Sequence, residues 1–266
     1  MNLEVLVSTM NRSDAAFANK MNINSDLLII NQSTKHCDNF EENNRFNIRM
    51  LSYSEKGLSK SRNRALENAK GDICLIADDD VSYNNDYSDK IIKAHEDYKD
   101  YDIIVFSVPT SNISRKKSYY SKKKKMGYLR SLKIASFEIS FKRKSIIDNN
   151  IYFNEKFGAG SGQYSMGEEN IFLYQCLKKG LKILYLPIEI GIVTHEESTW
   201  FNGFNEKLFW DKGAIYYEMS RYFSIPLILQ FAFRKYRLYI NEISIRKAIK
   251  YMLKGRAKYI NELKDK

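Results

Sequence analysis

The sequence predicts an α/β protein with a mostly parallel central sheet flanked by helices, followed by a helical, basic C-terminal region. Three observations support this. Short apolar runs alternate with helical patterns over the first hundred residues, polar residues follow several of these runs directly, and from about residue 203 apolar and basic residues interleave to the end. With 266 residues, 44% of them hydrophobic, the chain can bury a core and is too apolar to be generally disordered.

The first 108 residues contain the clearest elements. Continuous apolar runs are typical of strands buried on both faces of a parallel sheet. They predict strands over Leu3–Ser8, Leu27–Asn31, Ile48–Ser52 (the weakest), Ile73–Ala77 and Ile103–Val108. Apolar residues at helical spacing predict helices over Leu58–Ala69, with Gly71 as the stop, and Asp86–Tyr98. Ligands of such sheets sit at the carboxyl ends of the strands, where Ser8-Thr9, Asn31-Gln32 and Asp78–Asp80 fall.

The character of the chain changes after Pro109. Arg115–Lys125 holds seven basic residues in eleven and is expected to be a mobile loop, and Phe157–Gly167 holds four glycines. The remaining patterns predict a strand, a helix and two short strands, over Ile134–Phe141, Glu168–Lys179, Leu181–Leu186 and Gly191–Thr194.

Charge and cysteine content suggest the environment. The net charge is +11, and residues 201–266 hold fourteen basic and six acidic residues, so this part faces an anionic partner or is a solvated basic surface. Cys37, Cys74 and Cys176 are too scattered for a disulfide framework or a zinc cluster, which favours a reducing compartment. The N-terminus lacks the pattern of a signal peptide, and no run of 18 apolar residues occurs. We therefore expect an intracellular protein, with His36 and His95 at its surface.

Three consecutive aspartates, Asp78, Asp79 and Asp80, follow the buried run Ile73–Ala77. Alternation along a strand points Asp78 and Asp80 one way and Asp79 the other. Adjacent carboxylates repel one another unless a cation or strong donors compensate. The pattern favours Mg²⁺ or Mn²⁺, bound through one or two carboxylates and completed by substrate phosphates, over an acidic turn in solvent.

Two weaker patterns accompany the triplet. Arg62 and Arg64 lie near the start of the helix in GLSKSRNRALENA, where backbone N–H groups favour anions, so they either pair with a diphosphate or are simply solvated. Glu168 and Glu169 enter a helix after the glycine-rich segment. They either cap that helix or supply a general base beside an approach that the glycines leave open.

Taken together and in this order, these segments resemble the inverting family-2 glycosyltransferases of the GT-A fold. The resemblance runs from VLVSTMNR through LLIINQS, GLSKSRNRAL and ICLIADDDV to FGAGSGQYSMGEENIFL, and covers most of residues 3–200. It implies a Rossmann-like GT-A catalytic domain over residues 1–200, in which residues 1–108 bind the nucleotide-sugar and residues 109–200 the acceptor, with the helical basic region over 201–266. It also implies transfer from a nucleotide-diphosphate sugar, expected to be a UDP-sugar, with Mn²⁺ or Mg²⁺ as cofactor.

The resemblance also implies roles for single residues. Nucleotide-sugar contacts fall to Thr9, Asn11, Gln32, Arg62, Asp78 and Asp79, and metal ligation falls to Asp80 and Asp78. Gln32 stands where the family commonly has an aspartate that contacts the base, although a glutamine amide can still bond a uracil edge. Glu169 takes the place of the catalytic aspartate in the family's Glu-Asp pair, with one methylene more, and would be the general base. Glu168 would orient the acceptor.

Two further features each have two interpretations. His195 follows a strand after the helix of the base, and many metal-dependent relatives recruit a late histidine to the metal or diphosphate; a lone histidine can equally be a hydrogen-bonded structural residue. Pro226–Tyr239 places an apolar run beside three basic residues. It fits an interfacial element on anionic lipid, or a helix packed on the catalytic domain with a solvated basic side.

The expected partners are a nucleotide-sugar donor, a glycan or lipid-linked acceptor and an anionic membrane surface at the C-terminal region, without nucleic acid. The resemblance to this family suggests bacterial surface polysaccharide or lipid-linked glycan synthesis, in the cytoplasm or on the inner face of the membrane.

A sugar nucleotidyltransferase would normally show a glycine-rich loop with a lysine after the first strand, which STMNRSD lacks. A basic nucleic-acid-binding protein leaves the aspartate triplet unexplained. An inactive glycosyltransferase-like protein stays open, because Gln32 and Glu169 depart from the family pattern.

Overall fold

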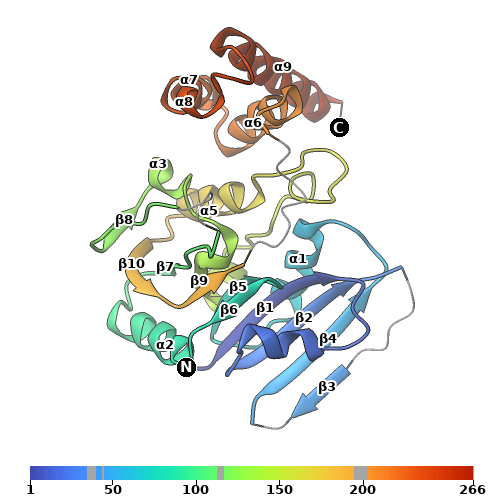
Figure 1. Ribbon diagram of the computed structural model, residues 1–266, viewed down its shortest axis with the longest axis vertical. Coiled ribbons are helices and arrows are strands. Elements are labelled where there is room, and N and C mark those ends of the chain that lie inside the picture. The colour runs from blue at the N-terminus through green and yellow to red at the C-terminus, as the bar shows by residue number, and fades with distance from the viewer. Residues whose placement is uncertain (35–39, 44, 113–116, 195–202, 266) are drawn as a thin grey trace.

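The computed structural model describes residues 1–34, 40–43, 45–112, 117–194 and 203–265 (Figure 1). Within these ranges, nine strands form one sheet in the order β3-β4-β2-β1-β5-β9-β7-β10-β8. In chain order they are β1 (Leu3–Met10), β2 (Asp26–Gln32), β3 (Phe40–Asn43), β4 (Asn47–Tyr53), β5 (Ile73–Asp78), β7 (Ile103–Ser107), β8 (Lys124–Met126), β9 (Ile139–Lys142) and β10 (Ile183–Glu189). A small antiparallel sheet pairs β6 (Val81–Tyr83) with β11 (Gly191–Val193).

The predicted mostly parallel sheet is confirmed. Strands β4, β2, β1 and β5 are parallel neighbours, and β7 pairs in parallel with β10. Between these two groups β9 runs antiparallel to both β5 and β7. The apolar runs that predicted β1, β2 and β5 are buried over almost their whole length, because helices cover both faces of the sheet.

Two predicted segments differ from the structure. The strand expected over Ile134–Phe141 begins only at Ile139, because Ser136–Glu138 forms a single 3₁₀ turn (η3). The turn is fixed by the buried Glu138 carboxylate, which accepts hydrogen bonds from the Ala135 amide at 3.0 Å and the Lys117 ammonium at 2.6 Å. Lys124 and Lys125, expected in a loop, lie in β8, which pairs with the edge of β10. Residues 113–116 of that loop lie outside the described residues.

Helices form two layers on the sheet and a third unit beyond it (Figure 1). One core lies between the sheet, α2 (Tyr87–Asp97) and the 3₁₀ helix η1 (Ala16–Met21). The opposite core takes in α1 (Leu58–Asn68), α4 (Arg143–Asp148) and α5 (Glu168–Lys178). The remaining helices are the short α3 (Tyr128–Ser131) and the C-terminal unit of α6 (Glu206–Met219), α7 (Ser224–Arg234), α8 (Tyr236–Tyr239) and α9 (Ile245–Lys264). None of the helices in the described ranges combines the length and apolar character that crossing a membrane requires.

Helix α5 joins the C-terminal unit to the rest of the molecule. Phe172 and Cys176 face the core on the sheet, whereas Ile171 and Tyr174 belong to the core of the C-terminal unit. Helices α6 and α9 approach each other closely. A Cβ on Gly213 would lie 1.8 Å from the Met252 carbonyl oxygen, so only glycine fits at this crossing.

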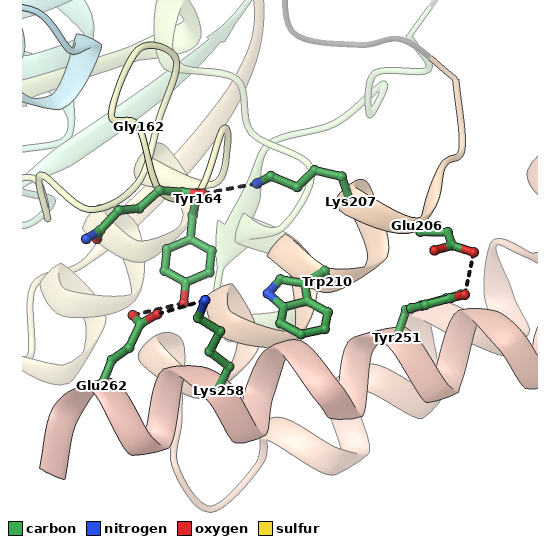
Figure 2. Close-up of a pocket in the computed structure, with 9 residues that line it drawn as sticks. Gly162, Tyr164, Glu206, Lys207, Trp210, Tyr251, Lys258 and Glu262 are labelled. Carbon is green, nitrogen blue, oxygen red and sulfur yellow. Dashed lines mark hydrogen bonds and ion pairs between the residues drawn. The ribbon is translucent and has the colours of Figure 1, made fainter. Parts of the chain in front are cut away.

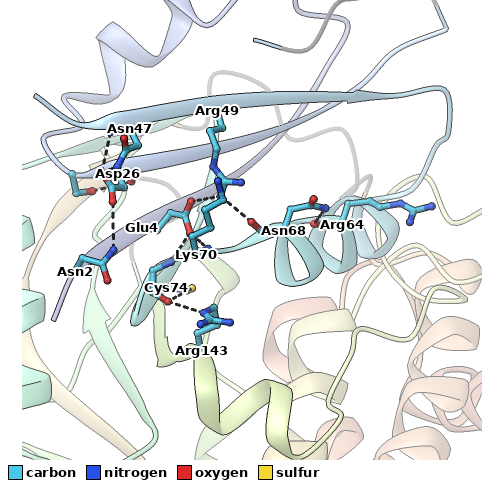
Figure 3. A network of polar contacts seen from close by, with 12 residues as sticks. Asn2, Glu4, Asp26, Asn47, Arg49, Arg64, Asn68, Lys70, Cys74 and Arg143 are labelled. Atoms are coloured by element: carbon cyan, nitrogen blue, oxygen red, sulfur yellow. Dashed lines mark hydrogen bonds and ion pairs between the residues drawn. The ribbon is translucent and has the colours of Figure 1, made fainter. Parts of the chain in front are cut away.

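A buried ion pair fixes the amino-terminal edge of the sheet, at the opposite end of β1 from the polar strand ends (Figure 3). Glu4 on β1 accepts a hydrogen bond from Arg49 on β4 at 2.6 Å. The same carboxylate accepts the amides of Lys70 and Gly71 at 2.6 and 2.9 Å. These contacts connect β1, β4 and the turn that leads from α1 into β5.

His95 is buried, contrary to the surface position expected for it. It lies on the inner side of α2, and its Nε2 pairs with the Ser140 hydroxyl on β9 at 2.9 Å. Burial lowers the pKa of His95 to about 3, with a smaller contribution from the Lys142 charge. The imidazole is therefore neutral and structural. His36 lies outside the described residues.

Candidate active site

The carboxyl ends of β1, β2 and β5 meet at one edge of the sheet and bring several predicted residues together. Thr9 at the end of β1 donates a hydrogen bond to Asp79 at 2.6 Å, and Arg12 forms an ion pair with the same carboxylate oxygen at 3.0 Å. Asn11 adopts a left-handed backbone conformation (φ 55°), and its amide donates to the Gln32 carbonyl at 3.0 Å. The turn after β1 is thereby fixed against β2 and faces the aspartates.

Gln32 is buried, and its side chain is engaged with the backbone at the start of α1. Its amide nitrogen donates to the Gly57 carbonyl at 3.1 Å, and its amide oxygen accepts the Gly57 N–H at 3.1 Å. Gly57 has a φ of 129°, a conformation that side-chain-bearing residues rarely adopt. The glutamine therefore holds the turn into α1, and contact with a nucleotide base stays a prediction.

Arg62 is the centre of the site. Its guanidinium, only 3% exposed, donates to Asp78 at the end of β5 at 3.0 Å and to Glu168 at the start of α5 at 2.9 Å. It also donates to the Ser136 hydroxyl at 2.8 Å and lies over the Phe153 ring. Burial opposes its charge, but the surrounding carboxylates outweigh this effect and raise its pKa. One buried cation thus connects the predicted donor and acceptor sides.

The glycine-rich segment packs against both helices of the site. The Leu58 amide donates to the Ala159 carbonyl at 2.9 Å, and the Ser59 hydroxyl donates to the Phe157 carbonyl at 2.6 Å. A Cβ on Gly158 would lie 3.2 Å from the Glu168 carboxylate, and its φ of 103° also favours glycine. The glycine therefore lets the chain pass close to this carboxylate.

The pKa of Glu169 is raised well above that of an ordinary glutamate. Burial, and then the negative charge of Glu168, raises its pKa to about 8, although Arg62 and Lys212 act in the opposite direction. Lys212 comes from α6, where burial lowers its pKa to about 8 despite the nearby Glu169. A general base works best when its pKa lies near the operating pH, and the catalytic role of Glu169 stays a prediction.

Asp80, the last aspartate of the triplet, is the predicted metal ligand. Asp78 is turned to Arg62 and Asp79 to Thr9 and Arg12, and the backbone carbonyl of Asp80 accepts the amide and hydroxyl of Thr194, both at 3.1 Å. In the described ranges no three His, Cys, Asp or Glu side chains group into a metal site. A Mg²⁺ or Mn²⁺ ion held mainly by substrate phosphates needs only one or two carboxylates, and ligation of such an ion by Asp80 and Asp78 stays a prediction. His195 lies outside the described residues.

Sequence reasoning missed three residues of the site. Arg12 could have been found, because it follows the first strand within the quoted MNR. Ser136 and Lys212 carry no local signal, since each approaches the site from an element far along the chain from the triplet. Arg64 is not brought into the site: it pairs at the surface with Glu55 and Glu67.

A separate hollow of about 570 Å³ lies between the glycine-rich segment, α6 and α9 (Figure 2). It shares no lining residue with the predicted site. Several of its polar groups bond within the protein: Tyr164 donates to Glu262 at 3.1 Å, and Lys207 donates to the Gln163 carbonyl at 3.0 Å. The hollow therefore does not extend the arrangement around Arg62.

Comparisons with known proteins agree with this geometry. The family model described as Glycosyl transferase family 2 matches residues 27–164, which include Gln32, Arg62 and the aspartate triplet but end before Glu168. No curated protein sequence matches the chain. Among solved structures, S. aureus TarS 1-349 superimposes with a TM-score of 0.64 at 14% identity, covering 99% of this chain and 83% of that one.

Two complexes of the same protein match similarly. TarS 1-349 with UDP-GlcNAc gives a TM-score of 0.64 at 16% identity, over 100% of this chain and 80% of that one. TarS 1-349 with UDP gives 0.63 at 16% identity, over 96% and 81%. At these identities the likeness concerns the fold, and it confirms the GT-A architecture. The family match covers more than half of the chain, so the protein is a glycosyltransferase that belongs to glycosyltransferase family 2.

Proposed function

We propose that the protein transfers a sugar from a UDP-sugar to an acceptor hydroxyl and inverts the anomeric centre. The observation that supports this most directly is the Arg62 bridge, in which one buried guanidinium donates to Asp78 at the end of β5 and to Glu168 at the start of α5, next to Glu169 with its raised pKa. UDP is the preferred nucleotide because structures of TarS with UDP and with UDP-GlcNAc share this fold.

In this mechanism Glu169 is the general base. Its carboxylate accepts the proton of the acceptor hydroxyl while the hydroxyl oxygen bonds to the anomeric carbon, and the bond from that carbon to the diphosphate breaks on the opposite side. Glu168, held by Arg62, orients the acceptor. A divalent cation on Asp80, with Asp78 beside it, would supply charge neutralisation for the departing diphosphate.

Thr9, Asn11 and Asp79 are proposed to line the nucleotide pocket, since the hydrogen bonds around Asp79 hold these strand ends together. We propose a glycan or lipid-linked acceptor in bacterial surface polysaccharide synthesis, with the enzyme in the cytoplasm. His195 stays a prediction as a further metal ligand.

Calorimetric titration of UDP and GDP, each with and without Mn²⁺, tests the donor-binding part of the proposed mechanism. We expect UDP to bind more tightly than GDP, to need the metal, and to lose binding in Asp80→Ala. Asp97→Ala, at the exposed end of α2, is the matched control and should bind like the parent protein. Equal, metal-independent binding of both nucleotides would contradict the proposal.

The catalytic half of the mechanism is tested on the same preparation. We expect the enzyme to release UDP from a UDP-sugar in the presence of acceptor, and Glu169→Gln to stop the release without weakening UDP binding. Tight UDP binding with no turnover of any UDP-sugar would contradict the proposed transfer.

A further inference from the structure

The outer side of α7 exposes large apolar side chains. Tyr222 and Phe223 precede the helix, and Ile225, Leu229 and Phe233 follow along it; we call these five residues the α7 outer face. Tyr222 is 93% exposed, Phe223 67% and Phe233 66%. Four of the five recur at intervals of three and four residues, which places them on one side of a helix. Single exposed apolar residues are ordinary, but a grouped set indicates an interaction surface.

The opposite side of α7 is fixed to the protein, so the outer face cannot turn inward. Leu227, Ile228 and Ala232 are buried in the core of the C-terminal unit. At the start of the helix the Ser224 hydroxyl accepts a hydrogen bond from Arg256 on α9 at 2.9 Å. A helix that is apolar all round is normally covered all round. The structure covers only one side of α7.

The segment of chain that carries the outer face has charges of one sign. Between Glu218 and Glu242 the chain holds four basic residues and no acidic one. All four are exposed: Arg221 precedes α7, Arg234 is its last residue, and Lys235 and Arg237 follow it. An anionic surface complements this arrangement. A second copy of the chain does not, because two-fold pairing would set the same basic residues against one another.

We propose that the α7 outer face docks the protein peripherally on an anionic lipid bilayer. The aromatic and aliphatic side chains enter the boundary between headgroups and acyl chains, while the flanking arginines and lysine pair with lipid phosphates. Tyrosine suits this depth because one end of its ring is apolar and the other polar. In Figure 1, α7 and α8 lie at one end of the long axis and β3 lies toward the other, so docking leaves most of the sheet away from the lipid.

Sedimentation with vesicles tests this directly, without donor or acceptor, so its outcome is separate from the transfer reaction. The full chain is mixed with vesicles of phosphatidylcholine alone or with added phosphatidylglycerol. We expect binding to the anionic vesicles, reduced by high salt. Phe223→Ser with Phe233→Ser, and separately Arg234→Glu with Arg237→Glu, should each weaken it by at least about tenfold.

Control variants make changes of the same kind elsewhere on the surface. Ile147→Ser on α4 removes an exposed apolar residue, and Lys93→Glu with Lys99→Glu, at and just after α2, makes the same change in net charge. Both controls should bind vesicles like the parent, and every variant should keep the parent's melting temperature. Absence of vesicle binding, equal binding to neutral and anionic vesicles, or controls as weak as the α7 variants would overturn the proposal. So would a dimer in sedimentation equilibrium that the double serine variant dissociates, since the face would then belong to a second copy.

Discussion

The protonation of Glu169 should set the pH dependence of transfer. Burial and the neighbouring Glu168 raise its pKa to about 8. A general base acts only when deprotonated, so at pH 7 about a tenth of the molecules would carry the active carboxylate, and the rate should rise about tenfold between pH 7 and pH 9. The measurement is kcat/KM for the acceptor across this range, because that ratio reports the titration of the free enzyme.

Removing a negative charge or a positive charge near Glu169 should move the midpoint of the pH profile of kcat/KM in opposite directions. Glu168→Gln removes a like charge and should shift the midpoint to lower pH, whereas Lys212→Met removes a cation and should shift it to higher pH. Glu169→Gln should lower kcat/KM by about 10²- to 10⁴-fold and abolish the rise. Glu96→Gln, exposed on α2, should leave the profile unchanged. A flat profile in the parent enzyme, or a rise that survives in Glu169→Gln, would refute the assignment of the base.

Three further substitutions test the site and the packing of the fold. Arg62→Lys cannot reach Asp78, Glu168 and Ser136 together, so kcat/KM should fall about 100-fold, and an unchanged value would contradict the bridging role. Glu4→Leu leaves the Arg49 charge buried and should lower the free energy of urea unfolding by about 3–5 kcal/mol, with a smaller loss when Arg49→Met is added. Gly213→Ala forces α6 from α9 and should lower the melting temperature, whereas Gly127→Ala, which meets no atom within 4 Å, should not.

The sequence predicted well the strands that are buried on both faces along almost their whole length. Parallel strands buried on both faces leave continuous apolar runs, and β1, β2 and β5 were found for that reason. The antiparallel β9 could not be placed between β5 and β7, since its pairing depends on residues far apart in the chain. His95 was misplaced because its burial follows from Ser140 on another strand.

For the site, too, the sequence predicted residues that stand in local motifs and missed contacts between distant segments. Arg62 and the aspartates stand in local motifs, and their approximate positions follow from the ends of strands. The contact between Arg62 and Glu168, in contrast, joins residues 106 positions apart in the chain, and no local sequence pattern near either residue predicts it. The same holds for Lys212, whose approach to Glu169 depends on how α6 packs over the start of α5.

The sharing of Arg62 between Asp78 and Glu168 has a thermodynamic consequence. A donor diphosphate that draws the guanidinium toward itself would change the field that the same cation exerts on Glu169, and so would change the pKa of Glu169. Linkage is reciprocal: protonation of Glu169 would then alter donor affinity by the same factor. Donor binding and the protonation of Glu169 would then be linked by a single coupling free energy.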